Sequence, residues 1–208
     1  MIQLLIIDDQ TLVRIASHRA LQDQYSISSI DSVATDFDAQ YLLKQHIPDV
    51  ILLDCVQSGI AKLNSVKRLL RYDHSLKIII FTECINSLFP KRLLECGAYG
   101  YLHKKASIEE CVTALSTVNA GKQYISSVIA DKMVNPSRLK AEECKMNDLS
   151  NRELEIMSLV AKGLRGTTIS QQLCLSPKTI SYYRNQIFGK LCLRNNIDIT
   201  RVAVRYGI

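Results

Sequence analysis

The sequence predicts two domains, an α/β domain with a doubly wound sheet of five parallel strands and an all-α domain of four helices. Two observations support this prediction. Up to residue 121, short aliphatic runs alternate five times with amphipathic helical stretches, and from residue 147 onward only helical patterns occur. Alternation of strand and helix is typical of βα units on a parallel sheet with helices on both faces. A chain of 208 residues is long enough for both domains.

Each of the five strands is predicted from a short run rich in aliphatic residues. The runs are QLLII, SISSIDSVA, DVILLD, KIIIF and GYL, at 3–7, 26–34, 49–54, 77–81 and 100–102. Helical patterns follow them at 11–22, 36–46, 60–71, 86–96 and 107–120. Because the carboxyl ends of parallel strands meet at one edge of a sheet, we expect the functional crevice at that edge.

The change of pattern also predicts the domain boundaries. We expect the first domain over residues 1–121, a linker over 122–146 and the helical domain over 147–208. The linker stretch contains Pro136 and five basic residues, and it includes one short helical pattern at 127–134.

The helical domain has clear start signals. Ser150 and Glu153 form a capping box, which predicts a helix from Asn151 to near Gly163. A short second helix is expected at 168–174, and a last helix at 197–206.

The third helix of this domain has two distinct faces. Ser176 is its expected N-cap, and Pro177 takes the first helical position, where a missing N–H costs nothing. An apolar stripe is formed by Ile180, Tyr183, Ile187 and Leu191. A polar stripe is formed by Lys178, Ser181, Tyr182 and Asn185. The apolar stripe is predicted to face the core, which leaves the polar stripe free to contact a partner.

The formal charge of +6 is shared unevenly between the two parts. Through residue 121 there are 12 Lys and Arg against 13 Asp and Glu, and from residue 122 onward there are 14 against 7. A basic C-terminal part indicates a polyanionic partner, most simply nucleic acid, although a solvated surface can also be this basic.

Composition argues against several other classes of protein. The seven cysteines are widely spaced and form no C-x-x-C pair, so neither a disulfide framework nor a zinc site is indicated. No apolar run approaches the roughly 20 residues of a membrane span, and the N-terminal run ends at Asp8, too early for a signal peptide. We therefore expect a cytoplasmic protein without membrane insertion.

Polar residues occur where the predicted strands end. Asp8 and Asp9 follow the first strand, Asp54 the third, Thr82 the fourth and Lys104 the fifth. Carboxylate oxygens are the ligands that Mg²⁺ prefers, and a bound metal would neutralise an incoming phosphoryl group. Asp54 is able to attack phosphorus to give an acyl phosphate, with Lys104 and Thr82 binding phosphoryl oxygens. Each residue alone is common at a strand end, so the prediction rests on the combination.

These motifs resemble a known family. IIDDQ, VILLDC, IIIFTEC and GYLHKK resemble the receiver domain of bacterial two-component response regulators, which has a flavodoxin-like fold. LSNRELEIMSLVAKG and LSPKTISYYRNQIFGKL are similar to the LuxR-type helix-turn-helix. Together they resemble the NarL/FixJ class over essentially the whole chain, and FPKRLLECGAYGYL, GKQYIS and TISQQLCLSPKT are most similar to its GacA/UvrY/LetA branch.

The resemblance implies a role for each residue at the strand ends. Asp54 would be the phosphoacceptor, with a sensor histidine kinase as phosphodonor. The magnesium ligands would be Asp8, Asp9, Asp54 and the backbone carbonyl of Val56. The switch would be formed by Thr82, Tyr101 and Lys104. Without the resemblance, Tyr101 would be interpreted as an aromatic side chain packed at a strand edge.

One departure from the family keeps alternatives open. The family usually has Met-Pro three and four residues after the phosphoacceptor, where this chain has Gln57 and Ser58, and the loss of proline removes a constraint on the loop backbone. The favoured function is a phosphorylation-controlled transcription factor and not an enzyme. The first alternative is a DNA-binding regulator whose receiver is not phosphorylated. The second, an aspartyl-phosphate hydrolase, usually has D-x-D directly after the first strand, and this chain has Asp8-Asp9-Gln10.

The resemblance also implies how DNA would be bound. The residues expected to contact DNA are Lys178, Thr179, Ser181, Tyr182, Arg184, Asn185 and Lys190. Family members of this class commonly dimerise on DNA through the last helix, which here indicates Val202, Ala203 and Tyr206. The same apolar face is equally compatible with a place in the core of the domain.

Overall fold

The computed structural model describes residues 1–54, 59–83, 88–134, 145–206 and 208. The chain divides into two compact units, one that ends at Val134 and one that begins at Asn135. Each unit has a core of its own and is described separately.

The N-terminal unit is built on one parallel sheet. Its strands are β1 (Ile2–Ile7), β2 (Ile27–Val33), β3 (Val50–Leu53), β4 (Ile78–Thr82), β5 (Gly100–His103) and β6 (Tyr124–Ile125). The order in the sheet is β2-β1-β3-β4-β5-β6, and every neighbouring pair is parallel. The direction of winding changes between β1 and β3, so the sheet is doubly wound as predicted. All four residues of β3 are buried, as expected for a central strand covered on both faces.

The sheet has one strand more than the five predicted. The backbone N–H of Tyr124 donates to the Tyr99 carbonyl, and that of Ser126 donates to the Tyr101 carbonyl, which adds β6 to the edge of β5. Gly100 permits this close approach, since a Cβ at that position would lie 3.0 Å from the Tyr124 carbonyl oxygen. A strand of two residues has no hydrophobic period, and for this reason β6 was included in the predicted linker.

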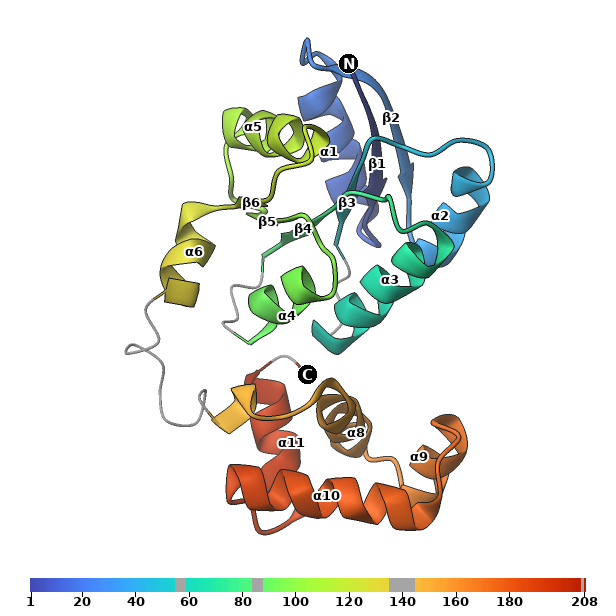
Figure 1. Ribbon diagram of the computed structural model, residues 1–208, viewed down its shortest axis with the longest axis vertical. Helices are drawn as coiled ribbons and strands as arrows, with labels where there is room; N and C mark the ends of the chain where they lie inside the picture. The colour runs from blue at the N-terminus through green and yellow to red at the C-terminus, as the bar shows by residue number, and fades with distance from the viewer. Residues whose placement is uncertain (55–58, 84–87, 135–144, 207) are drawn as a thin grey trace. The chain divides into compact units, whose positions relative to one another are not determined.

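Helices cover both faces of the sheet. They are α1 (Thr11–Gln22), α2 (Asp36–Leu43), α3 (Gly59–Tyr72), α4 (Phe89–Glu95) and α5 (Ile108–Asn119). The helices α1 and α5 lie on one side of the sheet, and α2 and α3 lie on the other (Figure 1). After β6 comes α6 (Ser127–Val134), where the sequence predicted a short helix. The part of the predicted linker up to Val134 therefore packs with the N-terminal unit.

The C-terminal unit is helical. Its helices are α8 (Asn151–Ala161), α9 (Gly166–Gln172), α10 (Pro177–Leu191) and α11 (Asn196–Arg205). The capping box of α8 is complete, with Glu153 N donating to Ser150 Oγ at 3.2 Å and Ser150 N donating to Glu153 Oε2 at 2.6 Å. The helix α9 begins two residues before its predicted start, because its N-cap, Arg165, supplies no side-chain cap to mark it. In the described ranges, no helix is long and apolar enough to cross a membrane.

Three of these helices are followed by a residue with positive φ. Gly163 follows α8 with φ +80°, Cys174 follows α9 with φ +53°, and Cys192 caps α10 with φ +56°. Glycine is the usual residue at such positions, because a side chain is strained in the left-handed region. Two cysteines therefore hold a backbone conformation that they adopt only at a cost in free energy.

Candidate functional site

Two of the predicted carboxylates meet at one lysine. Lys104 Nζ lies 2.7 Å from Asp8 Oδ2 and 2.6 Å from Asp54 Oδ2. All three side chains are buried. Backbone hydrogen bonds between neighbouring strands fix the positions of Asp54 and Lys104, since Asp54 N donates to the Ile7 carbonyl and Lys104 N donates to the Thr82 carbonyl. The sheet thus brings the ends of β1, β3 and β5 to one place, as the sequence predicted.

Lys104 is a fixed cation in this cluster. Burial on its own lowers the pKa of Lys104, but the hydrogen bonds to Asp54 and Asp8 outweigh burial and raise the pKa above its ordinary value of 10.5. Asp8 is held as well, because its Oδ1 accepts a hydrogen bond from the backbone N–H of Gln10 at 2.8 Å. The ammonium of Lys104 therefore stays charged at neutral pH beside the predicted phosphoacceptor.

A second lysine, which the sequence analysis did not single out, reaches the same cluster. Lys62 Nζ in α3 lies 3.0 Å from Asp54 Oδ1 and donates a hydrogen bond to Thr82 Oγ1. Its side chain is only 8% exposed. The sequence contained a signal for this orientation, because Lys62 stands four residues before Val66 and seven before Leu69, on the apolar stripe of the helix.

The geometry leaves one oxygen of Asp54 without a hydrogen bond. The Lys62 ammonium is close to Asp54 Oδ1 and donates one hydrogen bond to Thr82 Oγ1, and among the described residues Oδ1 accepts no hydrogen bond. A buried carboxylate oxygen of this kind is an acceptor that an electrophile or a cation can engage. Asp54 is therefore bound to Lys104 through Oδ2, while Oδ1 is buried beside the Lys62 ammonium and keeps its lone pairs free of hydrogen bonds within the described residues.

The other predicted site residues differ in their surroundings. Thr82 and Tyr101 are each only 2% exposed, on β4 and β5. Asp9 is exposed, directly after buried Asp8. Residues 56–58, which contain the predicted magnesium ligand Val56 and the departure from Met-Pro, lie outside the described residues.

The donor chemistry of the cluster fits a magnesium ion. Mg²⁺ usually binds one or two carboxylates and completes its shell with water and phosphate oxygens. Asp8 and Asp54 supply two buried carboxylates, and Asp54 Oδ1 is a hard oxygen without a hydrogen bond within the described part of the chain. The described residues contain no group of three His, Cys, Asp or Glu side chains arranged around one metal position. The cluster therefore fits a magnesium site with two carboxylate ligands, and this site lies next to two ammonium groups.

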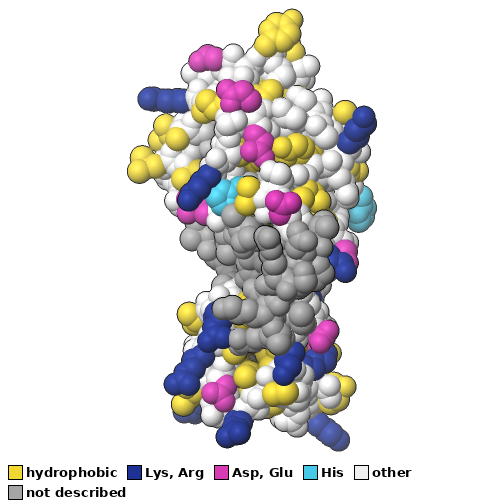
Figure 2. Space-filling view, turned by 90° about the vertical axis from the view of Figure 1, so that its left-hand side faces the viewer, with side chains coloured by type: hydrophobic (Ala, Val, Ile, Leu, Met, Phe, Trp, Pro, Cys, Tyr) yellow, Lys and Arg dark blue, Asp and Glu magenta, His cyan; other side chains and the backbone are white. Residues whose placement is uncertain are grey.

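The polar face of α10 is exposed as predicted. Lys178, Ser181 and Asn185 are exposed, and Tyr182 is 58% exposed. On the opposite face, Ile180, Ile187 and Leu191 are buried. Figure 2 shows Lys and Arg side chains spread over the visible face of the C-terminal unit. A polar helix face with basic side chains around it is suited to a polyanion.

Three residues predicted to contact DNA have partners inside the C-terminal unit. Lys190 Nζ lies 2.8 Å from Glu153 Oε2 and donates to the Asp148 carbonyl, so this lysine ties α10 to the start of α8. Arg184 Nη2 donates to Asn196 Oδ1 at 2.7 Å. The hydroxyl of Thr179 is hydrogen-bonded to the N-cap Ser176. The ammonium of Lys190 thus contributes to the fold of the domain, and its contact with DNA stays a prediction.

The residues predicted for dimerisation are buried. Val202 and Tyr206 are each 6% exposed and Ala203 is fully buried, and α11 packs against α8. Of the two readings that the sequence left open, the structure supports a place in the core for these three. The exposed apolar side chains of α11 are Ile197 and Val204. An apolar stripe in a sequence shows that a face is covered, but not what covers it.

Comparison with known proteins decides the family. Residues 4–116 match the response regulator receiver domain, and residues 147–203 match the bacterial regulatory proteins of the luxR family. The chain belongs to the response regulators with a LuxR-type DNA-binding domain.

Two named response regulators match this chain over its full length. It is 36% identical to the response regulator GacA of Pseudomonas aeruginosa, over 100% of this chain and 98% of the relative. It is also 36% identical to the response regulator UvrY of Escherichia coli strain K12, over 100% of this chain and 96% of the relative. The predicted similarity to the GacA/UvrY branch is thus confirmed.

Solved structures of another response regulator share its fold. RcsB from Salmonella enterica serovar Typhimurium bound to promoter rprA in the presence of phosphomimetic BeF3- is 21% identical, with a TM-score of 0.71 over 98% of this chain and 99% of that one. The two-component response regulator RcsB in a DNA complex gives 22% identity and a TM-score of 0.60 over 98% of both chains. The predicted fold class of a receiver domain with a parallel sheet, followed by a helical LuxR-type domain, is confirmed.

Proposed function

We propose that this response regulator is a transcriptional regulator whose binding to DNA is controlled by magnesium-dependent phosphorylation of Asp54. The observation that supports the proposal most directly is the state of the Asp54 carboxylate. It is buried at the end of β3, bound to Lys104 through Oδ2, and without a hydrogen bond at Oδ1 among the described residues. A nucleophile needs one oxygen whose lone pairs are not held in hydrogen bonds and a fixed environment for the other.

The covalent step is a transfer of one phosphoryl group. A carboxylate oxygen of Asp54 attacks phosphorus, a new P–O bond forms, and the bond from phosphorus to the donor breaks. The donor is a phosphohistidine of a sensor kinase, whose imidazole leaves and takes a proton from solvent, or a small acyl phosphate, whose carboxylate leaves as the anion. Lys104 is positioned to hold a phosphoryl oxygen, because its ammonium already contacts Asp54.

Magnesium, when bound, neutralises charge on the phosphoryl oxygens. Asp8 and Asp54 would hold it from the buried side, with Asp9 at the exposed rim and the backbone carbonyl of Val56 as a further ligand. Thr82 and Tyr101 would change their positions when Asp54 is phosphorylated. Thr82 is linked to Asp54 because its hydroxyl is hydrogen-bonded to Lys62, which contacts Asp54.

DNA would be bound by the exposed face of α10. Ser181, Tyr182 and Asn185 would face base edges, and Lys178 would contact phosphate. Solved structures of RcsB include dimers bound to DNA. We extend this to a homodimer of the present protein on DNA, for which exposed Ile197 and Val204 are the candidates on α11 that replace the buried residues.

The two alternatives differ in how well the observations support them. A regulator whose receiver is not phosphorylated is favoured by one observation, the ammonium of Lys62 beside the reactive oxygen of Asp54. An aspartyl-phosphate hydrolase has no supporting observation, because such an enzyme would leave the LuxR-type domain without a role. We propose a regulator and not an enzyme.

The test is the intact mass of the protein after incubation with Mg²⁺ and acetyl phosphate, beside an Asp54→Asn control. We expect one phosphoryl adduct in the wild type that needs both magnesium and Asp54. The phosphorylated protein should then bind its selected DNA site more tightly than the untreated protein. No adduct from a folded protein, or equal affinity of the two forms, would contradict the proposal in favour of the regulator that works without phosphorylation.

A further inference from the structure

Lys62 is the feature of the phosphoacceptor cluster that its proposed function does not use. The side chain extends from α3, 20 residues before Thr82 along the chain, and its ammonium contacts both Asp54 and Thr82. Long lysine side chains on amphipathic helices usually direct their ammonium to water. Here only 8% of the side chain is exposed, so the ammonium has been taken out of water and placed between the predicted phosphoacceptor Asp54 and the predicted switch residue Thr82.

The charges of the buried cluster balance without any added ion. Asp8 and Asp54 carry two negative charges, and Lys104 and Lys62 carry two positive charges, all within one network of contacts of 3.0 Å or less. With Lys104 alone, the two carboxylates would leave one negative charge without a counter-charge, which would attract a divalent cation. Lys62 removes that excess, and it also lies 3.0 Å from Asp54 Oδ1, the carboxylate oxygen that accepts no hydrogen bond in the described chain.

We propose that Lys62 is a resident cation of the phosphoacceptor site, which weakens the binding of Mg²⁺ and holds Thr82 in place before phosphorylation. This inference rests on the proposed function, since it names a positioning residue of the same site. A divalent cation bound at Asp54 Oδ1 must displace the ammonium or lie next to it, and like charges at such distances repel strongly in a buried site. The protein thereby needs more magnesium for phosphorylation than the same site would need without Lys62.

A second consequence concerns Thr82. Its hydroxyl oxygen accepts a hydrogen bond from the Lys62 ammonium, which also lies 3.0 Å from Asp54 Oδ1. A phosphoryl group on Asp54 would offer the ammonium several oxygens with more charge than a carboxylate oxygen. Lys62 would then move toward the phosphoryl group and release its hydrogen bond to Thr82, which couples the phosphoacceptor to the switch residue through one side chain.

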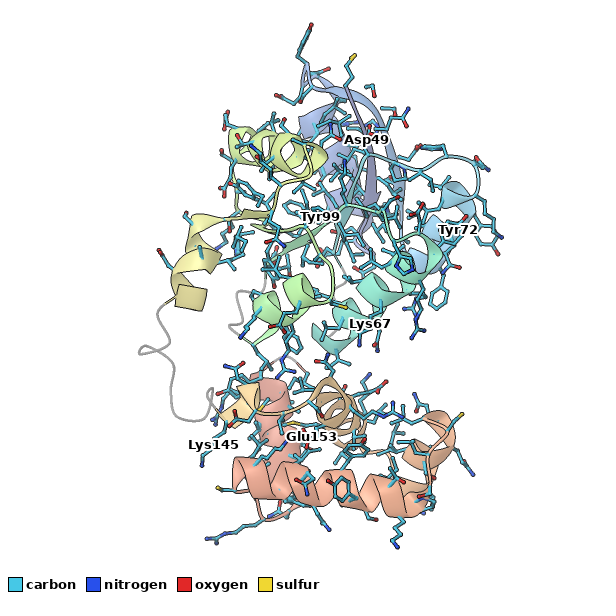
Figure 3. The ribbon with its side chains drawn as sticks, in the orientation of Figure 1. Asp49, Lys67, Tyr72, Tyr99, Lys145 and Glu153 are labelled. Carbon is cyan, nitrogen blue, oxygen red and sulfur yellow. The ribbon has the colours of Figure 1, made fainter. Side chains whose placement is uncertain are left out.

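The experiment measures metal binding and needs no phosphorylation. Mn²⁺ is used as the probe, because the electron paramagnetic resonance signal of the free ion reports the bound fraction, and Mg²⁺ is then added as a competitor. The full-length proteins compared are the wild type, Lys62→Met, Lys62→Gln, Lys62→Arg and the control Lys67→Met. Lys67 lies on the same helix, is half-buried, and has no contact with Asp54 or Thr82 among those the structure gives (Figure 3).

We expect Lys62→Met and Lys62→Gln to bind Mn²⁺ and Mg²⁺ about tenfold more tightly than the wild type, or better, because one positive charge is removed from the site. Lys62→Arg and Lys67→Met should bind as the wild type does. If Lys62→Met fails to fold by circular dichroism, Lys62→Gln, which keeps a donor for Thr82, provides the same comparison. Equal metal affinity of the wild type and a folded variant without the charge would overturn the inference.

A second readout separates this inference from the proposed function. The magnesium concentration that gives half-maximal labelling by acetyl phosphate should fall in Lys62→Met by about the same factor as the metal affinity rises. If neither protein is labelled, the proposed phosphorylation fails, while the ratio of metal affinities still decides the role of Lys62. If both proteins are labelled at the same magnesium concentration and bind the metal with equal affinity, the proposed phosphorylation is supported and the proposed role of Lys62 is contradicted.

Discussion

Lys190 and Glu153 form an ion pair of 2.8 Å that joins two helices of the DNA-binding domain. Glu153, which is labelled on α8 in Figure 3, also accepts a hydrogen bond from the backbone N–H of Ser150 at 2.6 Å, so one carboxylate caps α8 and contacts α10. The side chain of Glu153 is 4% exposed in this position. A single buried carboxylate therefore links the start of α8 to α10, in addition to the apolar packing of α10.

This arrangement predicts a loss of stability in acid. Burial on its own raises the pKa of Glu153, but the hydrogen bonds from Lys190 and Ser150 outweigh it, and the pKa lies below its ordinary value of 4.5. A group whose pKa is lower in the folded state stabilises the fold above its unfolded pKa, and this contribution is lost as the pH falls through the folded pKa. We expect the unfolding midpoint of the C-terminal unit in urea to be steady from pH 7 to about 5.5 and to decline below about 4.5.

The variant Glu153→Gln supplies the comparison. At pH 7 it should lower the free energy of unfolding by roughly 1–3 kcal/mol, the range for hydrogen bonds to charged groups. The difference from the wild type should shrink as the pH falls, because the wild-type carboxylate becomes neutral as well. A difference of the same size at both ends of the pH range would show that packing, and not charge, is responsible.

Local signals in the sequence predicted the parts of the fold that depend on local physics. The capping box at Ser150 and the Ser-Pro pair at 176–177 fix helix starts through contacts within four residues, and α8 and α10 begin where those signals placed them. The aliphatic runs predicted every strand long enough to show a pattern. The two-residue β6 depends on hydrogen bonds to β5, which a sequence pattern of two residues does not reveal.

The candidate site shows the same limit. Asp8, Asp54 and Lys104 were predicted together because the strands that carry them end at one edge of a parallel sheet. Lys62 was not predicted because lysine side chains usually extend into solvent. Only its position on the apolar stripe of α3 indicates that this side chain is directed to the interior. The burial of Val202 was left undecided because an apolar stripe does not specify its partner.

The positive φ of Cys174 predicts a stabilising substitution. A residue other than glycine in the left-handed region costs about 1–2 kcal/mol of stability. A substitution by glycine removes this strain, but roughly half of the stability gained is lost again because glycine makes the unfolded chain more flexible. Cys174 is exposed, so its replacement removes little buried surface. We expect Cys174→Gly to raise the free energy of unfolding of the C-terminal unit by roughly 0.5–1 kcal/mol. Cys174→Ala is the control, because it removes the thiol and keeps the strained Cβ, and an equal gain from alanine would exclude the backbone explanation.

The exposed face of α10 predicts separable effects on DNA binding. Lys178→Ala should weaken binding to all duplexes and reduce the slope of log K against log salt by about 0.9, the value for one phosphate contact. Exposed Lys162, which lies outside α10, is the matched control, and Lys162→Ala should leave the slope unchanged. Salt titrations on one random duplex measure both variants. An unchanged slope for Lys178→Ala would remove its assigned phosphate contact.

Base reading is tested on the same helix by a different measurement. Tyr182→Ala and Asn185→Ala should relax the sequence preference obtained by selection from a random duplex library, and a lost amide contact to a base corresponds to about 1–3 kcal/mol at one position. Lys190→Ala should behave differently, because its ammonium is paired with Glu153 and the main effect is on stability. A relaxed preference in Lys190→Ala with unchanged stability would show that Lys190 acts at the DNA interface and not in the fold.

Lys104 predicts the largest effect on the stability of the receiver unit. Its ammonium lies between the buried carboxylates of Asp8 and Asp54, so Lys104→Met leaves two like charges close together, and removal of one partner from a buried ion pair typically costs about 3–5 kcal/mol. Because the pKa of Lys104 is raised above 10.5, its contribution is fully present below that value and is lost only as the pH rises through the folded pKa. The loss of unfolding free energy in Lys104→Met, measured in urea, should thus be equal at pH 7 and pH 9. The double variant with Asp8→Asn should recover part of this loss, so that the two substitutions together cost less than the sum of their separate costs. A deficit that disappears at pH 9 would mean that the lysine is neutral there, and additive single effects would mean that Asp8 and Lys104 do not interact.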